Sequence, residues 1–204
     1  MKKIVFIVMA ALAVFSCTQK KQVQLLDASA FEAEVDGKQV SLYTLHAGEI
    51  TMQVTNYGAR VVTLWTPDKS GNQEDIVLGY NNLDSYVNNP GERFLGAVVG
   101  PYANRIAKGT YTIGDQVYNF PQNNNGQTLH GGLKGLDMVV WDVDTLTTDS
   151  IVFSYLRPDG QEGMPGNLKI VMTYTLTPEN EFRVDYLAQT DKATHVNISH
   201  HSFF

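Results

Sequence analysis

The sequence predicts an all-β protein made of antiparallel sheets, and three observations support this. Apolar residues recur with a period of two, as in Ile50, Met52 and Val54, which is typical of strands with one buried face. Turn-forming residues separate these runs, and no long stretch has helical periodicity. The 204 residues, 43% hydrophobic and 18% charged, suit one or two globular domains with a sizeable core.

Residues 1–17 are interpreted as a secretory signal of the lipoprotein type. Two lysines precede an apolar run over residues 4–15, which is too short for a comfortable membrane span. Val14-Phe15-Ser16-Cys17 resembles a bacterial lipobox, in which the cysteine carries the lipid; the alternative is an ordinary thiol in a signal. Cys17 is the only cysteine, so no disulfide can form within the chain. We expect export to the cell envelope, membrane contact only through a lipid anchor at Cys17, and a polar tether over residues 18–27.

The first half of the chain reads as short strands joined by turns. Asn56-Tyr57-Gly58-Ala59 predicts a tight turn, residues 76–79 a brief buried strand, and residues 83–93 a loop. Further strands are expected over residues 39–45, 50–55 and 60–65.

The second half predicts three strand pairs. Residues 111–113 and 117–120 flank Gly114-Asp115 as a hairpin. Residues 141–146 and 151–156 form the next pair, and residues 168–176 and 182–188 a hairpin with one face on a core. The chain after the tether, residues 28–204, is therefore expected to form a sandwich or a barrel-like stack of antiparallel sheets.

Four stretches carry polar side chains in a way that packing alone does not require: residues 100–109, 123–132 and 159–168, which also contain glycine, and residues 197–204. In the second, two glycines follow His130 and leave its imidazole uncovered; the alternative is a solvated histidine in a turn. In the first, Arg105 offers a planar fork of donors suited to sugar oxygens; the alternative is a surface arginine.

Composition and motifs exclude several classes of function. The net charge is −6 without a basic cluster, so nucleic acid is not an expected partner. Adjacent His200 and His201 would point to opposite faces of a strand and could not share a zinc ion, so no metal site is expected. A nucleophile elbow, a phosphate loop and a dinucleotide fingerprint are absent from the sequence. No cofactor is expected to be required; a structural calcium ion stays open, without an EF-hand-like spacing to support it.

Five motifs, in order and spacing, resemble the aldose 1-epimerase (galactose mutarotase) family. They are Asn56-Tyr57-Gly58-Ala59, Asn104-Arg105-Ile106, Leu129-His130-Gly131-Gly132, Glu162-Gly163-Met164-Pro165-Gly166-Asn167-Leu168 and Asn197-Ile198-Ser199-His200-His201-Ser202-Phe203-Phe204. The last departs from the family pattern, because His200 replaces an asparagine and Phe203 a tyrosine. The resemblance implies a large antiparallel β-sandwich with a sugar cleft, in a protein expected to be a monomer.

The resemblance also implies a reaction, the interconversion of the α- and β-anomers of aldohexoses such as glucose and galactose. An acid protonates the ring oxygen while a base removes the proton of the C1 hydroxyl, and the opened sugar recloses on the other face. His201 would be the proton donor, and Asn104, Arg105 and His130 would bind the sugar. The family's general base is a glutamate further toward the C-terminus, and no acid in this sequence, Glu162 included, occupies its position. The sandwich is therefore expected to be incomplete at the C-terminus, and the fragment weak or inactive alone.

Two alternatives stay open. A lipid-anchored carbohydrate-binding protein would hold the sugar without turning it over. A hexose-6-phosphate epimerase would need further cations for the phosphate, and no additional cluster of arginine or lysine lies near the motifs.

Overall fold

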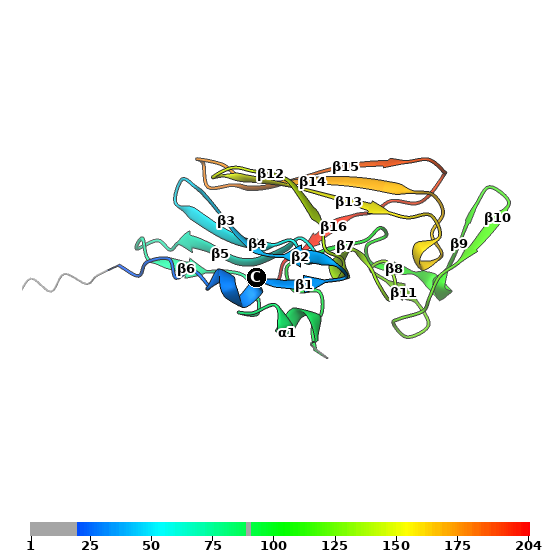
Figure 1. Ribbon diagram of the computed structural model, residues 1–204, viewed down its shortest axis with the longest axis horizontal. Coiled ribbons are helices and arrows are strands. Elements are labelled where there is room, and N and C mark those ends of the chain that lie inside the picture. The colour runs from blue at the N-terminus through cyan, green and yellow to red at the C-terminus, as the bar shows by residue number, and fades with distance from the viewer. Residues whose placement is uncertain (1–19, 89–90) are drawn as a thin grey trace, which may run out of the picture.

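The computed structural model describes residues 20–88 and 91–204. Two four-stranded antiparallel sheets are stacked face to face (Figure 1), which confirms the all-β prediction. The first sheet has the order β3 (Leu42–Ala47), β4 (Ile50–Thr55), β5 (Arg60–Pro67) and β6 (Gln73–Asp75). The second has the order β12 (Asp142–Leu146), β13 (Ser150–Arg157), β14 (Leu168–Leu176) and β15 (Phe182–Thr190). The predicted signal with Cys17 lies outside the described residues.

Short strand pairs and helices complete the fold. The pairs are β1 (Ala33–Val35) with β2 (Lys38–Val40), β7 (Ala97–Val99) with β16 (Ser199–His201), β8 (Arg105–Ile106) with β11 (Thr128–Leu129), and β9 (Thr110–Ile113) with β10 (Gln116–Asn119). The helices are α1 (Asp84–Val87) and the 3₁₀ turns η1 (Ala28–Phe31), η2 (Ala107–Gly109), η3 (Leu136–Met138) and η4 (Gln161–Gly163). Among the described residues, no helix is long and apolar enough to cross a membrane.

The main core lies between the two large sheets. Alternate residues of β14, from Leu168 to Leu176, are buried there, as the period of two predicts. The first sheet contributes Leu45, Met52 and Leu64 to the same cluster. Burial of these apolar side chains holds the sandwich together.

The prediction that residues 50–55 bury only one face is wrong. All six residues of β4 are buried, because a second apolar cluster built from η1, α1 and the loops covers the other side of the sheet. The polar side chains on that side have partners: Gln53 Oε1 accepts the N–H of Leu26 at 2.9 Å, and Gln53 Nε2 donates to the Leu26 carbonyl at 3.2 Å. Residues 20–27, the described part of the predicted tether, are thus bonded to the sheet.

Other boundaries also differ from the prediction. Residues 76–79 form no strand; Ile76 and Leu78 are exposed, and the Asp75 carboxylate accepts the N–H groups of both Leu64 and Val77 at the end of β6. Residues 39–45 are split between β2 and β3, and residues 83–93 contain α1. The hairpin at residues 182–188 is formed, but β15 is an edge strand with Leu187 57% exposed. The period of two does not reveal which strand lies at an edge.

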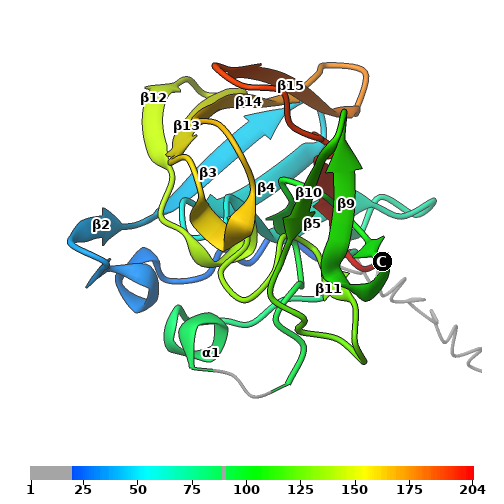
Figure 2. The ribbon, with the colours of Figure 1, turned by 90° about the vertical axis from the view of Figure 1, so that its right-hand side faces the viewer.

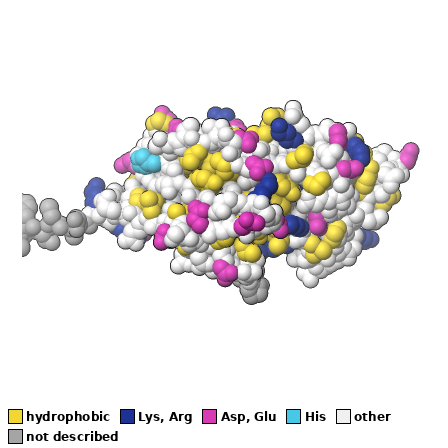
Figure 3. Space-filling model, viewed as in Figure 1, with side chains coloured by type: hydrophobic (Ala, Val, Ile, Leu, Met, Phe, Trp, Pro, Cys, Tyr) yellow, Lys and Arg dark blue, Asp and Glu magenta, His cyan; other side chains and the backbone are white. Residues whose placement is uncertain are grey.

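The strands that carry the polar stretches lie together. Strands β7, β8, β11 and β16 gather toward one end of the sandwich, beside the projecting β9–β10 hairpin (Figures 1 and 2). On the face shown in Figure 3, basic side chains lie interspersed with acidic and apolar ones. The large sheets thus form a rigid support, and the polar loops occupy one end of it.

Replacing Met172 by alanine tests the packing of the core. Met172 is fully buried between the sheets, so we expect Met172→Ala to lower the free energy of unfolding. The loss should be about 2–5 kcal/mol, the scale for removing a large buried side chain. Leu187→Ala, on the exposed edge strand, is the matched control and should cost less than about 1 kcal/mol. Urea titration measures both, and equal losses would contradict the assigned core.

Candidate functional site

The polar stretches around Asn104 and His130 meet where β8 pairs with β11. Arg105 lies opposite Leu129 in this short ladder. One residue beyond the pair, Asn104 and His130 both adopt left-handed backbone conformations, with φ values of 64° and 53°. The backbone N–H of Asn104 donates to His130 Nδ1 at 3.0 Å, and the backbone N–H of His130 donates to the Asn104 carbonyl at 3.0 Å. These reciprocal hydrogen bonds fix both residues in the turn.

The hydrogen bond at Nδ1 determines how His130 can act. Burial, followed by the charges of His201 and Arg105, lowers the pKa of His130 to about 4, and Asp137 opposes this shift. The imidazole is therefore neutral near pH 7. A neutral ring that accepts at Nδ1 carries its proton on Nε2. His130 thus presents Nε2–H as a hydrogen-bond donor.

His201 lies beside His130 in the structure. The strand β16 places His201 opposite Ala97 of β7. The ring centroids of His130 and His201 are 4.9 Å apart, and the rings are edge-to-face at 84°. Phe94 packs against both, with centroid distances of 4.7 Å to His130 and 5.8 Å to His201. Two histidines 71 positions apart in the sequence thus converge on one surface.

His200 points to the other face of β16, as strand alternation predicts. Its ring is 5.6 Å from that of Tyr174, a fully buried residue of β14. The side chains of the adjacent residues His200 and His201 therefore lie in different surroundings. His200 belongs to the interior, and His201 belongs to the site.

Arg105 extends the site toward a neighbouring pocket. Its Nη1 donates to Asn104 Oδ1 and its Nε to Asn124 Oδ1, both at 3.2 Å, and the side chain is exposed. The pocket, of about 310 Å³, is also lined by Tyr102, Tyr111 and His195. Asn104 and Arg105 thus form one edge of the surface that carries His130.

An ion pair that the sequence did not reveal supports the loops. Asp137 is completely buried, and its carboxylate accepts from Arg93 Nε at 2.8 Å and from Arg93 Nη2 at 3.0 Å. The guanidinium of Arg93 also stacks on Phe94 at 4.7 Å. Buried Arg60 donates to the carbonyl oxygens of Asp137 and Leu95 at 2.8 and 2.9 Å. These contacts connect the Phe94 loop with the loop that follows His130, and no motif or periodicity indicates them.

The third polar stretch contributes through Glu162. One carboxylate oxygen of Glu162 accepts the N–H of Leu133 at 2.7 Å. Gly132 adopts a φ of 99°, which favours glycine, and a Cβ atom there would lie 2.3 Å from that oxygen and displace the Glu162 carboxylate. At Gly131 a Cβ would lie 2.0 Å from the carbonyl oxygen of Gly100. The two glycines after His130 therefore also allow close packing within the protein, beyond the uncovered imidazole that the sequence predicted.

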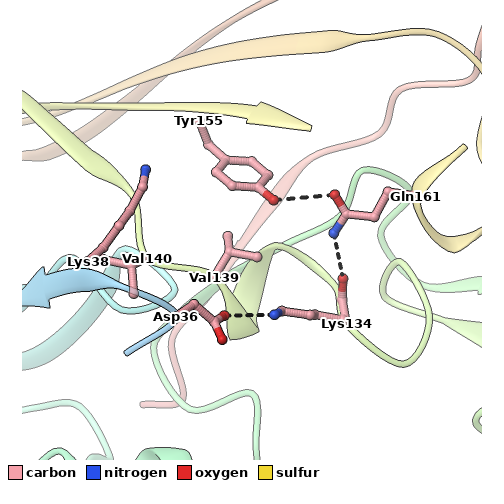
Figure 4. A pocket seen from close by; sticks show the side chains of 7 residues that line it. All are labelled: Asp36, Lys38, Lys134, Val139, Val140, Tyr155 and Gln161. Atoms are coloured by element: carbon pink, nitrogen blue, oxygen red, sulfur yellow. Dashed lines mark hydrogen bonds and ion pairs between the residues drawn. The ribbon is translucent and has the colours of Figure 1, made fainter. Parts of the chain in front are cut away.

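A larger hollow of about 390 Å³ lies beside this region, and none of the predicted site residues lines it (Figure 4). Lys134 pairs with Asp36 at 2.7 Å at its rim. Tyr155 donates to Gln161 Oε1 at 3.3 Å, and Gln161 donates to the Lys134 carbonyl at 3.4 Å. Its charged groups already have partners, because Lys134 pairs with Asp36 and Lys38 pairs with Asp142 outside the hollow.

The Arg93–Asp137 pair gives a direct test of the support. We expect Asp137→Asn to lower the free energy of unfolding by roughly 3 kcal/mol, because it leaves Arg93 with an uncompensated charge. Asp185→Asn is the matched control, since Asp185 pairs with Arg183 on the exposed strand β15. That change should cost at most about 1 kcal/mol. Chemical denaturation compares the two, and an equal cost would show that Asp137 provides no special support.

Comparison with known proteins agrees with this geometry. The family model for aldose 1-epimerase matches residues 41–204. Galactose mutarotase of Mus musculus is 39% identical over 168 residues, which cover 82% of this chain and 48% of that protein. Aldose 1-epimerase of Haemophilus influenzae is 32% identical over 181 residues, covering 88% of this chain and 52% of that protein.

Solved structures show the same fold. A GalM/aldose epimerase homologue from C. elegans superposes with a TM-score of 0.77 at 28% identity, covering 80% of this chain and 50% of that one. Galactose 1-epimerase from Lactobacillus acidophilus superposes with a TM-score of 0.73 at 30% identity, and the match covers 85% of this chain and 51% of that one. The chain spans about half the length of the curated relatives it matches. From the family match and the shared fold, this chain belongs to the aldose 1-epimerase family.

Proposed function

We propose that the complete gene product is an aldose 1-epimerase that interconverts the α- and β-anomers of aldohexoses such as glucose and galactose. The observation that carries the proposal is the edge-to-face contact of His130 and His201, beside Asn104 and Arg105, in a chain of this family. Anomerisation needs one acid and one base near the ring oxygen and C1. Histidine suits such proton transfer near neutral pH.

In the proposed reaction His201 protonates the ring oxygen as the C1 hydroxyl loses its proton, and the hemiacetal opens to an aldehyde. Rotation about the C1–C2 bond and reclosure, with the two roles reversed, give the other anomer. His130 holds the sugar through Nε2–H, because a ring with a pKa of about 4 is neutral near pH 7 and lacks the second proton that an imidazolium would donate as an acid. Arg105 and Asn104 add donors at the same edge. The acid role of His201 rests on the resemblance to the family, and the neutral ring of His130 supports its role as a binding residue.

We assign the role of general base to no carboxylate of the described residues. The carboxylates of Asp137 and Glu162 are both engaged, one with Arg93 and the other with the N–H of Leu133. We therefore propose that residues 18–204 on their own turn sugar over weakly or not at all. Family-like turnover by that fragment would refute this part of the proposal.

The hydrogen bonds that occupy the carboxylates of Asp137 and Glu162 also support the second candidate, a carbohydrate-binding protein without turnover. Such a protein would use the donors of His130 and Arg105 and would need no base. Binding of galactose by the complete gene product, without anomerisation, would favour this candidate.

Substitution of the two histidines in the complete gene product tests the enzyme. Polarimetry of fresh α-D-glucose should show a loss of about 10²–10⁴-fold in His201→Ala, the range typical of a general acid. His130→Ala should also lose activity, with weaker sugar binding. His46→Ala is the matched control, because His46 is an exposed residue of β3 whose Nδ1 lies 3.0 Å from Thr51 Oγ1. Unchanged anomerisation in both site variants would overturn the assignment.

A further inference from the structure

His200 is a histidine that the proposed reaction does not use. It lies on β16 directly before His201, with its side chain on the opposite face. Its ring is wedged between two aromatic rings, with centroids 5.6 Å from Tyr174 and 5.4 Å from Phe182, both at nearly right angles. This packing leaves little freedom to the ring. Both ring nitrogens of this tightly packed histidine have hydrogen-bond partners.

The hydrogen bonds around His200 have one consistent direction. Tyr174 Oη donates to the Ala59 carbonyl at 2.8 Å, so its single proton is committed there. At 3.1 Å from His200 Nδ1, the tyrosine oxygen must then accept, which requires a proton on Nδ1. In the neutral ring Nε2 has no proton, so it accepts from Ser202 Oγ at 2.6 Å. The chain runs from Ser202 through His200 and Tyr174 to Ala59.

This chain of hydrogen bonds adds side-chain support to the backbone bonds of β16. The strand has three residues and pairs along one edge, with β7. Through Tyr174 the side chain of His200 attaches it to β14 in the second large sheet. The hydrogen bond from Tyr174 to the Ala59 carbonyl also connects β16 to the turn that precedes β5 in the first sheet. Because His201 is the next residue of β16, these contacts also restrict the position of its ring.

We propose that His200 is a positioning residue for the sugar site, whose Nδ1–H tautomer clamps β16 onto Tyr174 and holds His201 edge-on to His130. The catalytic consequence rests on the proposed function; the tautomer and the clamp do not. His130 in the site and His200 behind it would then be fixed in opposite tautomers, Nε2–H for His130 and Nδ1–H for His200.

The clamp should depend on pH in one direction. The titratable group that faces His200 is Tyr174; the neighbouring His201, on the opposite face of β16, acts on His200 through its charge. Burial first, and then the charge of His201, lower the pKa of His200 to about 4. A pKa below the ordinary value of 6.5 means that folding favours the neutral ring, so the clamp is intact above pH 6.5 and fails as pH falls through about 4. Protonation of Nε2 would remove the acceptor that Ser202 uses.

The tautomer is tested by NMR on the complete gene product labelled with ¹⁵N at histidine. At pH 7 the long-range spectrum should show His200 with a protonated Nδ1 and an accepting Nε2, identified by its loss in His200→Asn. A protonated Nε2, or a rapidly averaged pair of tautomers, would overturn the clamp. This readout does not require the protein to turn over sugar.

The positioning role is tested by three variants in the polarimetric assay. His200→Phe keeps ring volume without hydrogen bonds and should lower kcat by on the order of 10–10²-fold, the cost of a small misplacement of a catalytic group. KM should change much less. His200→Asn, whose Nδ2 can take the place of Nδ1 and donate to Tyr174, should recover most of the loss, and Ser202→Ala should give a smaller loss in the same direction. His46→Phe is the matched control and should change neither constant.

The possible outcomes separate the two proposals. Full kcat in His200→Phe, or equal losses in His200→Phe and His200→Asn, would overturn the positioning role. Should His200→Phe fail to fold, Ser202→Ala decides the matter, since full activity at pH 7 in that variant refutes the clamp. If the wild type itself shows no turnover, the proposed enzyme function fails, while the tautomer measurement still decides the clamp.

Discussion

The reciprocal hydrogen bonds between Asn104 and His130 are the constraint on which the site depends. Each residue adopts a left-handed conformation, and each backbone N–H is satisfied by the other residue. Such backbone strain persists only where the surroundings determine it, and here the β8–β11 ladder and the ion pair of Arg93 with the buried Asp137 do so. One consequence is chemical: the bond to Nδ1 leaves His130 with its proton on Nε2, aimed for donation.

The large sheets and the small site are stabilised in different ways. The sheets bury the apolar side chains and give rigidity, whereas the site uses short strands of two or three residues that have little stability of their own. Polar side chains in the interior therefore secure them. Asp137 holds the loops on one side, and the hydrogen-bond chain through His200 is proposed to hold β16 on the other. A site built on rigid support can keep two imidazole rings at a fixed angle.

Local sequence signals predicted the all-β class, most strand pairs and the turn before Arg60, because alternation and turn residues act locally. The resemblance of five motifs placed Asn104, Arg105, His130 and His201 together, and the structure brings them together. The sequence did not reveal Asp137, Arg93 or Phe94, since a buried ion pair leaves no periodic signal. It also misjudged residues 76–79 and the covered face of β4, because burial depends on which distant segment covers a strand.

The pKa of His130 tests the central claim, that this loop presents a neutral imidazole as a fixed donor. A pH titration of histidine-labelled complete gene product by NMR would follow its ring nitrogens, with His130→Asn identifying the signal. The account predicts a pKa near the value of about 4 that burial and the charge of His201 give it, and an Nε2–H tautomer at pH 7. A pKa close to the ordinary value of 6.5, or a proton on Nδ1, would contradict it.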